Sequence, residues 1–185
     1  SEDNLPLNNN RSVWNSGVDS QNGGLTSDQI SEGVKEFLFH SENRDSSTGL
    51  PTNVKYIWIG FEDRITKEYL NFTGLKIYDN SDTPLEYSED NGGNIDETSD
   101  ITVLKASSQF NANHKVSNMF KDIGTSNTNT FASESSSNEY AILTLKELKT
   151  ISKVELFKRR DSEARVKHVF VKLFDSNMHE IMRSG

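Results

Sequence analysis

The sequence predicts an all-β protein in the form of an antiparallel β-sandwich, and three observations lead to this fold class. Short runs of β-branched and aromatic residues recur along the chain from residue 54 onward, as expected of strands. Turn-forming clusters of Asp, Asn and Ser separate several of these runs, and the other connections are long and polar. Helical spacing of apolar residues is confined to one short segment, so strands joined by loops are the expected architecture.

The first 25 residues are expected to form an extended polar arm. Asn, Ser and Gly dominate this segment, and its few apolar residues follow no period, so it cannot bury a core of its own. Trp14 stands alone in this polar stretch, and such a tryptophan is typical of an anchor that fills a pocket on a partner protein. The arm and Trp14 therefore indicate protein neighbours in a larger assembly.

Residues 26–53 are expected to be a connecting segment or the end of a preceding module. Ile30, Val34 and Leu38 recur at the spacing of one helix face, which predicts a short helix. The apolar run Phe37–Phe39 is also compatible with a strand, and the sequence leaves the two alternatives open.

The sandwich is predicted to occupy residues 54–185. Val54–Phe61 is apolar on both faces, which predicts a buried strand and favours a core position for Trp58. In the last long strand Val171 alternates with Lys172, so only one face is expected to enter the core. Strands are expected at 54–61, 70–78, 101–104, 140–145, 152–157 and 166–174, with a return strand near 179–182.

Charge is distributed unevenly along the chain. The net charge is −8, yet residues 140–185 carry ten Lys and Arg against six Asp and Glu, which leaves −12 on residues 1–139. An acidic protein is poorly suited to generic nucleic-acid binding, because the phosphate backbone repels it. The turn Lys158–Arg165 concentrates the positive charge, and it is either a loop that binds sugars or anions or a solvated charged turn.

Several functional classes lack their sequence signatures. No apolar run approaches the roughly 18 residues of a membrane-spanning helix, and the chain has no cysteine, which excludes disulfides and thiolate metal sites. G-x-S-x-G, a phosphate-binding glycine loop and H-E-x-x-H are all missing, and the four histidines have no ligand spacing. We therefore expect a protein that is neither an enzyme nor a membrane-spanning protein.

Four blocks of sequence occur in an order that resembles a known family. They are YLNFTGLKIYD at Tyr69–Asp79, TVLKASSQF at Thr102–Phe110, NMFKDIG at Asn118–Gly124 with TFAS at 130–133, and the run from Glu139 to Ile181. These blocks are similar to those of galactose-binding-like, or discoidin (coagulation-factor type C), β-sandwich modules, in the fucolectin-like variant seen in algal and large-virus proteins. The resemblance spans residues 54–182 and implies a jelly-roll sandwich.

The resemblance also implies a ligand site, because modules of this kind hold a sugar with loops at one end of the sandwich. Two arginines grip the sugar hydroxyls in the family, and the forked donors of arginine suit this task. Arg159 or Arg160 stands at the first arginine position and Arg165 at the second. Asp161 is the partner of the first arginine. The histidine position of the family falls near Ala132–Ser133, where this chain has no imidazole.

Calcium is the one cofactor that the resemblance implies, since these modules often hold the ion in an Asp-Gly loop with help from a glutamate. Asp122 occupies the loop position, although Ile123 separates it from the glycine. Gly74 stands in place of the glutamate. Calcium requires hard oxygen ligands, so Asp122 is the candidate ligand.

These observations predict a non-catalytic carbohydrate-binding or adhesion module that binds a glycan or glycoprotein through loops at one end of a sandwich. An extracellular, cell-surface or virion location follows from the resemblance. The alternative is a structural protein of a minor-capsid or surface assembly. In that case the jelly roll is a scaffold, and the N-terminal arm ties neighbouring subunits together.

Overall fold

The protein is all-β in the residues that the structure, a computed structural model, describes: 33–39, 49–121, 128–160 and 163–184. All of its paired strands run antiparallel to their neighbours. The only helices in these ranges are short 3-10 turns, η2 (Val116–Phe120) and η3 (Glu163–Val166). The predicted fold class is confirmed at this level, and none of the described helices could cross a membrane.

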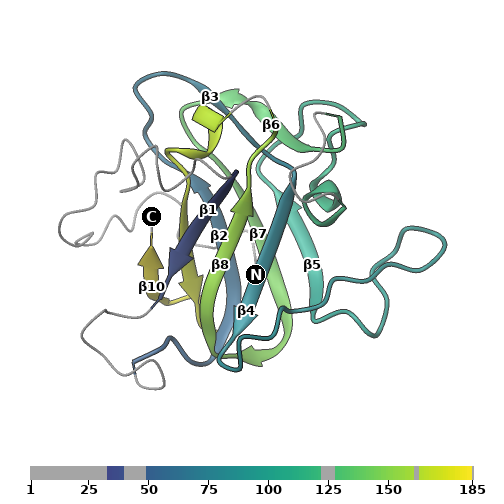
Figure 1. Ribbon diagram of the computed structural model, residues 1–185, viewed down its shortest axis with the longest axis vertical. Helices are drawn as coiled ribbons and strands as arrows, with labels where there is room; N and C mark the ends of the chain where they lie inside the picture. The colour runs from purple at the N-terminus through teal and green to yellow at the C-terminus, as the bar shows by residue number, and fades with distance from the viewer. Residues whose placement is uncertain (1–32, 40–48, 122–127, 161–162, 185) are drawn as a thin grey trace.

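The strands form three sheets (Figure 1). The five-stranded sheet has the order β10 (Glu180–Ser184), β9 (Phe170–Phe174), β2 (Val54–Phe61), β7 (Glu139–Lys149) and β5 (Ile101–Ala106). The three-stranded sheet has the order β1 (Val34–Leu38), β8 (Ile151–Phe157) and β4 (Gly74–Asp79). The third sheet pairs β3 (Glu68–Phe72) with β6 (Phe131–Ser136).

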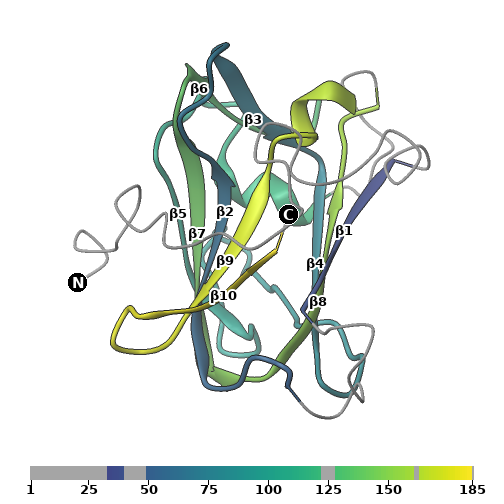
Figure 2. The same ribbon diagram turned by 90° about the vertical axis from the view of Figure 1, so that its left-hand side faces the viewer.

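The two larger sheets face each other as layers, an arrangement consistent with a β-sandwich. Figure 2 shows β1, β8 and β4 on one side and β2, β7 and β5 on the other, with β3, β6 and η3 together at one end. The main apolar core lies between the layers, and each large aliphatic side chain buried there contributes about 1.5–3 kcal/mol. Its fully buried members include Ile57, Ile59, Leu143, Val154, Leu156, Val171 and Leu173.

The strand predicted at 70–78 is wrong as a single element, because Thr73 divides it. The hydroxyl of Thr73 donates to the carbonyl oxygens of Phe157 (3.3 Å) and Lys158 (3.2 Å), and its N–H donates to that of Phe157 (2.9 Å). These bonds tie the chain to the end of β8. Residues before Thr73 therefore join β3, and residues after it join β4 in a different sheet.

The helix considered between residues 26 and 40 is not present at Val34–Leu38, which forms β1 and pairs with β8 in the register Phe37↔Val154. Lys35 and Phe37 are buried, whereas Glu36 and Leu38 are exposed, which is the two-residue period of a strand. The layers therefore include chain that precedes residue 54, the expected start of the sandwich.

Lys172 is buried, which corrects the prediction that it faces solvent. All of β9 is buried, because the outer face of the five-stranded sheet carries a second apolar cluster that includes Trp58 and Phe170. The Lys172 ammonium lies 4.3 Å from the ring centroid of Trp58 and forms an ion pair with the carboxylate of Glu62. We refer to Lys172, Glu62 and Trp58 as the Lys172 cluster.

The remaining predictions have mixed outcomes. The strands expected near 54–61, 101–104, 140–145 and 152–157 are confirmed as β2, β5, β7 and β8, and the hairpin after Asp175 leads into β10. The strand expected from Val166 begins only at Phe170, since Val166 belongs to η3 and a turn closed by the Val169 N–H and the Val166 carbonyl oxygen follows it. Strand β6 lies in the long polar segment before residue 140, where a connection without a strand was expected. The N-terminal arm and Trp14 lie outside the described residues.

Candidate functional site

Arg165 is the predicted site residue around which a site can be built. It lies in the short turn η3, one residue before the end of that turn, and η3 packs beside β3 at the end of the molecule seen uppermost in Figure 1. Its guanidinium carbon lies 4.9 Å from the ring centroid of Tyr69, which β3 supplies. A cation over an aromatic face at this distance is attracted by the ring quadrupole. The side chain of Arg165 is 29 % exposed and can therefore be reached from solvent.

Two further contacts fix the orientation of the Arg165 guanidinium. Its Nη1 donates to Oδ1 of Asn71 (2.9 Å), and its Nε lies 3.7 Å from Oε1 of Glu68. Asn71 is itself buried, and its amide nitrogen donates to the carbonyl oxygen of Phe131 (2.8 Å). The guanidinium is thus held by β3 on several sides, which leaves less conformational entropy to be lost when it binds a ligand.

Two more rings continue the surface from Tyr69. Phe110 contacts Tyr69 edge to face, with centroids 5.8 Å apart and an interplanar angle of 84°. His114 contacts Phe110 in the same manner at 5.5 Å and 86°. Phe110 is 52 % exposed, so its ring is partly open to solvent. We refer to Arg165, Tyr69, Phe110 and His114 as the ring row.

A buried carboxylate fastens the loop that carries Phe110. Glu139 accepts hydrogen bonds from the hydroxyls of Ser107 (3.1 Å) and Ser108, and it is only 4 % exposed. The N–H of Phe110 donates to the carbonyl oxygen of Ala132 (2.8 Å), which attaches the loop to β6. The exposed ring is therefore carried by an anchored loop, as a binding platform requires.

His114 presents one ring nitrogen that the described contacts leave for a ligand. Its Nδ1 lies 2.7 Å from Oδ1 of Asn111, which also accepts the N–H of Asn113 (2.9 Å). An amide oxygen only accepts hydrogen bonds, so Nδ1 of His114 carries the proton. In the neutral imidazole Nε2 is then an acceptor.

Arg159 and Arg160, two other predicted residues of the basic turn, lie beside Lys158. Arg160 is exposed and Arg159 is half-buried, and their carbonyl oxygens accept hydrogen bonds from Nζ of Lys158 at 3.0 and 3.4 Å. Asp161 lies outside the described residues. Arg165 is the predicted contact from which the ring row is built.

A histidine from another part of the chain lies near the position where the resemblance placed one. The N–H of Ala132 donates to the carbonyl oxygen of His114 (3.2 Å), so His114 lies beside the segment where the resemblance placed a histidine. Sequence reasoning missed this because the two residues are far apart in the chain. Phe110 offered a signal, since it is a large aromatic residue between Gln109 and Asn111 in a polar loop.

The calcium prediction stays untested by the described contacts. Asp122 lies outside the described residues, and Gly74, at the position of the family's glutamate, has no side chain to contribute. Within the described ranges no three His, Asp or Glu side chains gather as metal ligands would.

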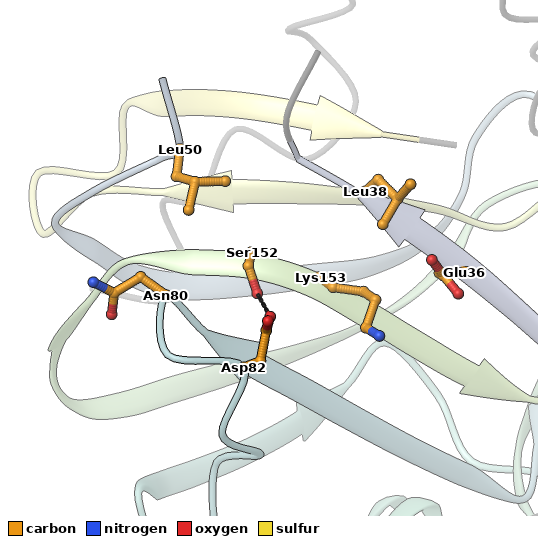
Figure 3. Close-up of a pocket in the computed structure, with 7 residues that line it drawn as sticks. All are labelled: Glu36, Leu38, Leu50, Asn80, Asp82, Ser152 and Lys153. Atoms are coloured by element: carbon orange, nitrogen blue, oxygen red, sulfur yellow. Dashed lines mark hydrogen bonds between the residues drawn. The ribbon is translucent and has the colours of Figure 1, made fainter. Parts of the chain in front are cut away.

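A separate pocket of about 210 Å³ lies beside the start of β8 (Figure 3). The basic turn lies elsewhere, because it follows the end of that strand. The polar wall of the pocket includes Lys153, whose Nζ lies 4.4 Å from the Tyr78 ring centroid and 3.9 Å from the Glu155 carboxylate. Burial, followed by the hydrogen bond to Glu155, raises the pKa of Tyr78 to about 12. The described lining contains no aromatic ring: Glu36, Leu38, Leu50, Asn80, Asp82, Ser152 and Lys153.

Comparison with known proteins adds no relative to this picture. No family model matches the sequence, and no curated protein and no solved structure is significantly similar to it. The function must therefore be argued from the ring row itself.

Proposed function

We propose that the protein is a non-catalytic carbohydrate-binding module and that the ring row is its ligand site. The observation that carries this proposal is the placement of Arg165, a half-exposed guanidinium held over Tyr69 by Asn71 and Glu68. Together with the exposed ring of Phe110 it forms a surface with both polar and apolar groups. Sugars require both, since they present hydroxyls at their edges and C–H groups on their faces.

The chemistry of the row favours a neutral sugar over an acidic one. Arg165 supplies forked donors for adjacent hydroxyls, and Nε2 of His114 supplies an acceptor. Glu68, 3.7 Å from Nε of Arg165, offsets much of the positive charge that would attract an anion. Phe110 and Tyr69 offer apolar surface for the face of a sugar ring. A neutral glycan with vicinal hydroxyls fits these groups best.

The proposal includes the family and the setting that the sequence resemblance implies. A galactose-binding-like jelly roll would place its binding loops at one end of the sandwich, and β3 and η3, which carry Tyr69 and Arg165, lie at one end of the two layers. Adhesion to glycans at a cell surface or on a virion is the biological role that follows.

A glycan array tests the proposal, with the wild type compared with Arg165→Ala and Phe110→Ala. We expect neutral glycans to bind the wild type and both variants to lose at least about tenfold in affinity, since each removes a central contact. Lys146→Ala is the matched control, because it also removes an exposed cation. Lys146 lies near the C-terminal end of β7, whereas Glu139, which fastens the loop of Phe110, is at the N-terminal end.

The array also separates this proposal from the structural alternative. A wild type that binds no glycan and assembles into a multimer or a particle would reject the carbohydrate-binding role and favour the capsid or surface-assembly role. Binding that survives Arg165→Ala would show that the ring row is not the site.

A further inference from the structure

Lys35 has a charged group in a place where charges are rarely found. It belongs to β1, the edge strand of the three-stranded sheet, and its side chain points into the molecule with 0 % exposure. Its Nζ lies 5.2 Å from the ring centroid of Phe37. Burial lowers the pKa of Lys35 to about 7, and no carboxylate is among the causes of this shift. Such a group is retained only where hydrogen bonds satisfy it.

Backbone carbonyls supply the partners of this amine. Nζ of Lys35 donates to the carbonyl oxygens of Val166 (3.1 Å), Lys167 (2.9 Å) and Val169 (2.6 Å). An ammonium ion can donate one N–H to each of the three carbonyl oxygens, whereas a neutral amine has only two N–H groups. The geometry is that of a small cation in a cage of carbonyl oxygens, with the cation attached to β1.

The caged carbonyls belong to the turn that directly follows Arg165. Val166 ends η3, and the N–H of Val169 donates back to its carbonyl oxygen (3.2 Å) before β9 begins. A cation at the C-terminal carbonyls of a helical turn stabilises that turn. The path of the backbone through this turn decides where Arg165 leaves it, and therefore whether the guanidinium reaches Tyr69.

We infer that Lys35 is a positioning residue for Arg165, and that its ammonium group holds the turn at Val166–Val169 in the conformation that completes the ring row. The inference rests on the proposed function in so far as Arg165 contacts the glycan. It connects an edge strand on one layer with the ligand-binding end of the molecule through one side chain.

The chain allows a clean test because it contains no cysteine. Lys35→Cys introduces a single thiol, which can be alkylated in the unfolded protein before refolding. Bromoethylamine rebuilds a side chain with a terminal ammonium, and bromopropane builds a neutral chain of nearly the same shape. Lys35→Met, made without alkylation, provides a second neutral side chain.

Two measurements report on the turn without any ligand. Amide hydrogen exchange is followed at residues 163–169, with β2 and β7 as internal references. The Nε–H resonance of Arg165, assigned with Arg165→Lys, reports on the guanidinium. We expect the aminoethyl protein to match the wild type, and the propyl protein and Lys35→Met to exchange at least about tenfold faster at 163–169 with references changed less than about twofold.

Each other outcome overturns the inference. Neutral side chains that leave both the exchange at 163–169 and the Arg165 resonance unchanged would show that the ammonium does not position the turn. Faster exchange throughout the molecule, or a neutral protein that does not fold, would assign Lys35 to global stability instead. An aminoethyl protein that behaves like the propyl protein would exclude the charge as the cause.

A glycan array run on the same proteins distinguishes this inference from the proposed function. If the wild type binds no glycan but the neutral variants loosen the turn, the proposed function fails and the role of Lys35 stands. If the wild type and the propyl protein bind glycan equally and exchange equally, the role of Lys35 fails and the proposed function stands.

Discussion

Two regions of the molecule combine the same three kinds of chemical group, a cation, an aromatic ring and a carboxylate, but differ in how far the charged groups are exposed to solvent. In each, a cation lies over an aromatic ring and beside a carboxylate. In the Lys172 cluster the two charged side chains are 0 % and 1 % exposed. At the ring row the corresponding pair is Arg165 and its neighbour Glu68, which are 29 % and 26 % exposed. Burial is therefore the variable that separates the two regions.

This difference indicates what each region can do. Charges removed from water incur a desolvation penalty, and their mutual attraction offsets it only while both partners are present. Burial accordingly lowers the pKa of Lys172, although Glu62 opposes the shift. A half-exposed pair keeps much of its hydration and contributes little to stability, but its donors can reach a ligand. Removing a charge from the first region should damage the fold, and removing one from the second should damage binding.

The largest expected effect on stability comes from Glu62→Gln. The substitution leaves the buried ammonium of Lys172 without its counter-charge, so we expect the free energy of unfolding to fall by about 3–5 kcal/mol. Urea denaturation followed by circular dichroism measures this loss. Glu68→Gln is the matched variant in the exposed pair and should lose about 1 kcal/mol or less.

A double variant sharpens this prediction. Lys172→Met combined with Glu62→Leu removes both charges together and should recover most of the stability lost in Glu62→Gln, since a buried pair can often be replaced by apolar groups. A double variant that is less stable than Glu62→Gln would show that the pair stabilises the fold beyond compensating for its own burial.

The second largest effect concerns pH and Lys35, a buried cation that has carbonyls instead of a carboxylate. Folding lowers the pKa of Lys35 from 10.5 to about 7 by burial. Between these values the unfolded chain binds more protons than the folded one, so stability rises with pH across this window and is lowest below pH 7. Urea unfolding at pH 7 and about pH 9.5 should show the wild type gaining about 1–3 kcal/mol relative to Lys35→Met.

No difference between the two proteins over this pH range would mean that Lys35 titrates in the folded protein much as it does in the unfolded chain. The comparison with Lys35→Met is needed because burial also lowers the pKa of Lys172, which makes stability change with pH in the same direction.

A smaller effect is expected for Arg165→Ala. The salt bridge to Glu68 is partly exposed, but the substitution also removes the donor to buried Asn71, so we expect the free energy of unfolding to fall by about 1–2 kcal/mol. The same substitution should abolish the glycan signal under the proposed function. A loss of several kcal/mol would place Arg165 with the structural cations and break the comparison.

The smallest effect on stability is expected for Phe110→Ala. Half of this side chain is already in water, so we expect a change within about 1 kcal/mol, well below the cost of removing a core aromatic residue. Binding to glycans should nevertheless weaken. Thermal unfolding measures the change in stability, and a glycan titration measures the change in affinity. A marked loss of stability with unchanged affinity would show that Phe110 is a packing residue.

The central strands could be predicted from the sequence because their pattern is local. Val54–Phe61 is apolar at nearly every position, and the structure places it as β2 in the middle of the five-stranded sheet. Lys172 could not be placed correctly, since the alternation of β9 indicates an outward residue. Lys172 is buried because Trp58 of β2 and Glu62, the residue after β2, lie against it.

The site was less predictable than the central strands because its residues come from distant parts of the chain. Arg165 could be selected by its type and by the family pattern, but its partners on β3 come from nearly a hundred residues earlier in the chain. His114 reaches the row because the loop of Phe110 pairs with β6. Contacts of this range depend on topology, which no local pattern encodes.

Strand β1 has a mechanical consequence. It is five residues long and, among the strands that the structure describes, it pairs with β8 alone, so tension applied through the preceding chain should separate it from β8 one hydrogen bond at a time. Withdrawing β1 would also pull Lys35 from its carbonyl cage. A load on the N-terminal side would then release the turn beside Arg165 before the five-stranded sheet yields. In single-molecule pulling, an early low-force event that Lys35→Met weakens would reveal this order, and a single rupture of the whole fold would refute it.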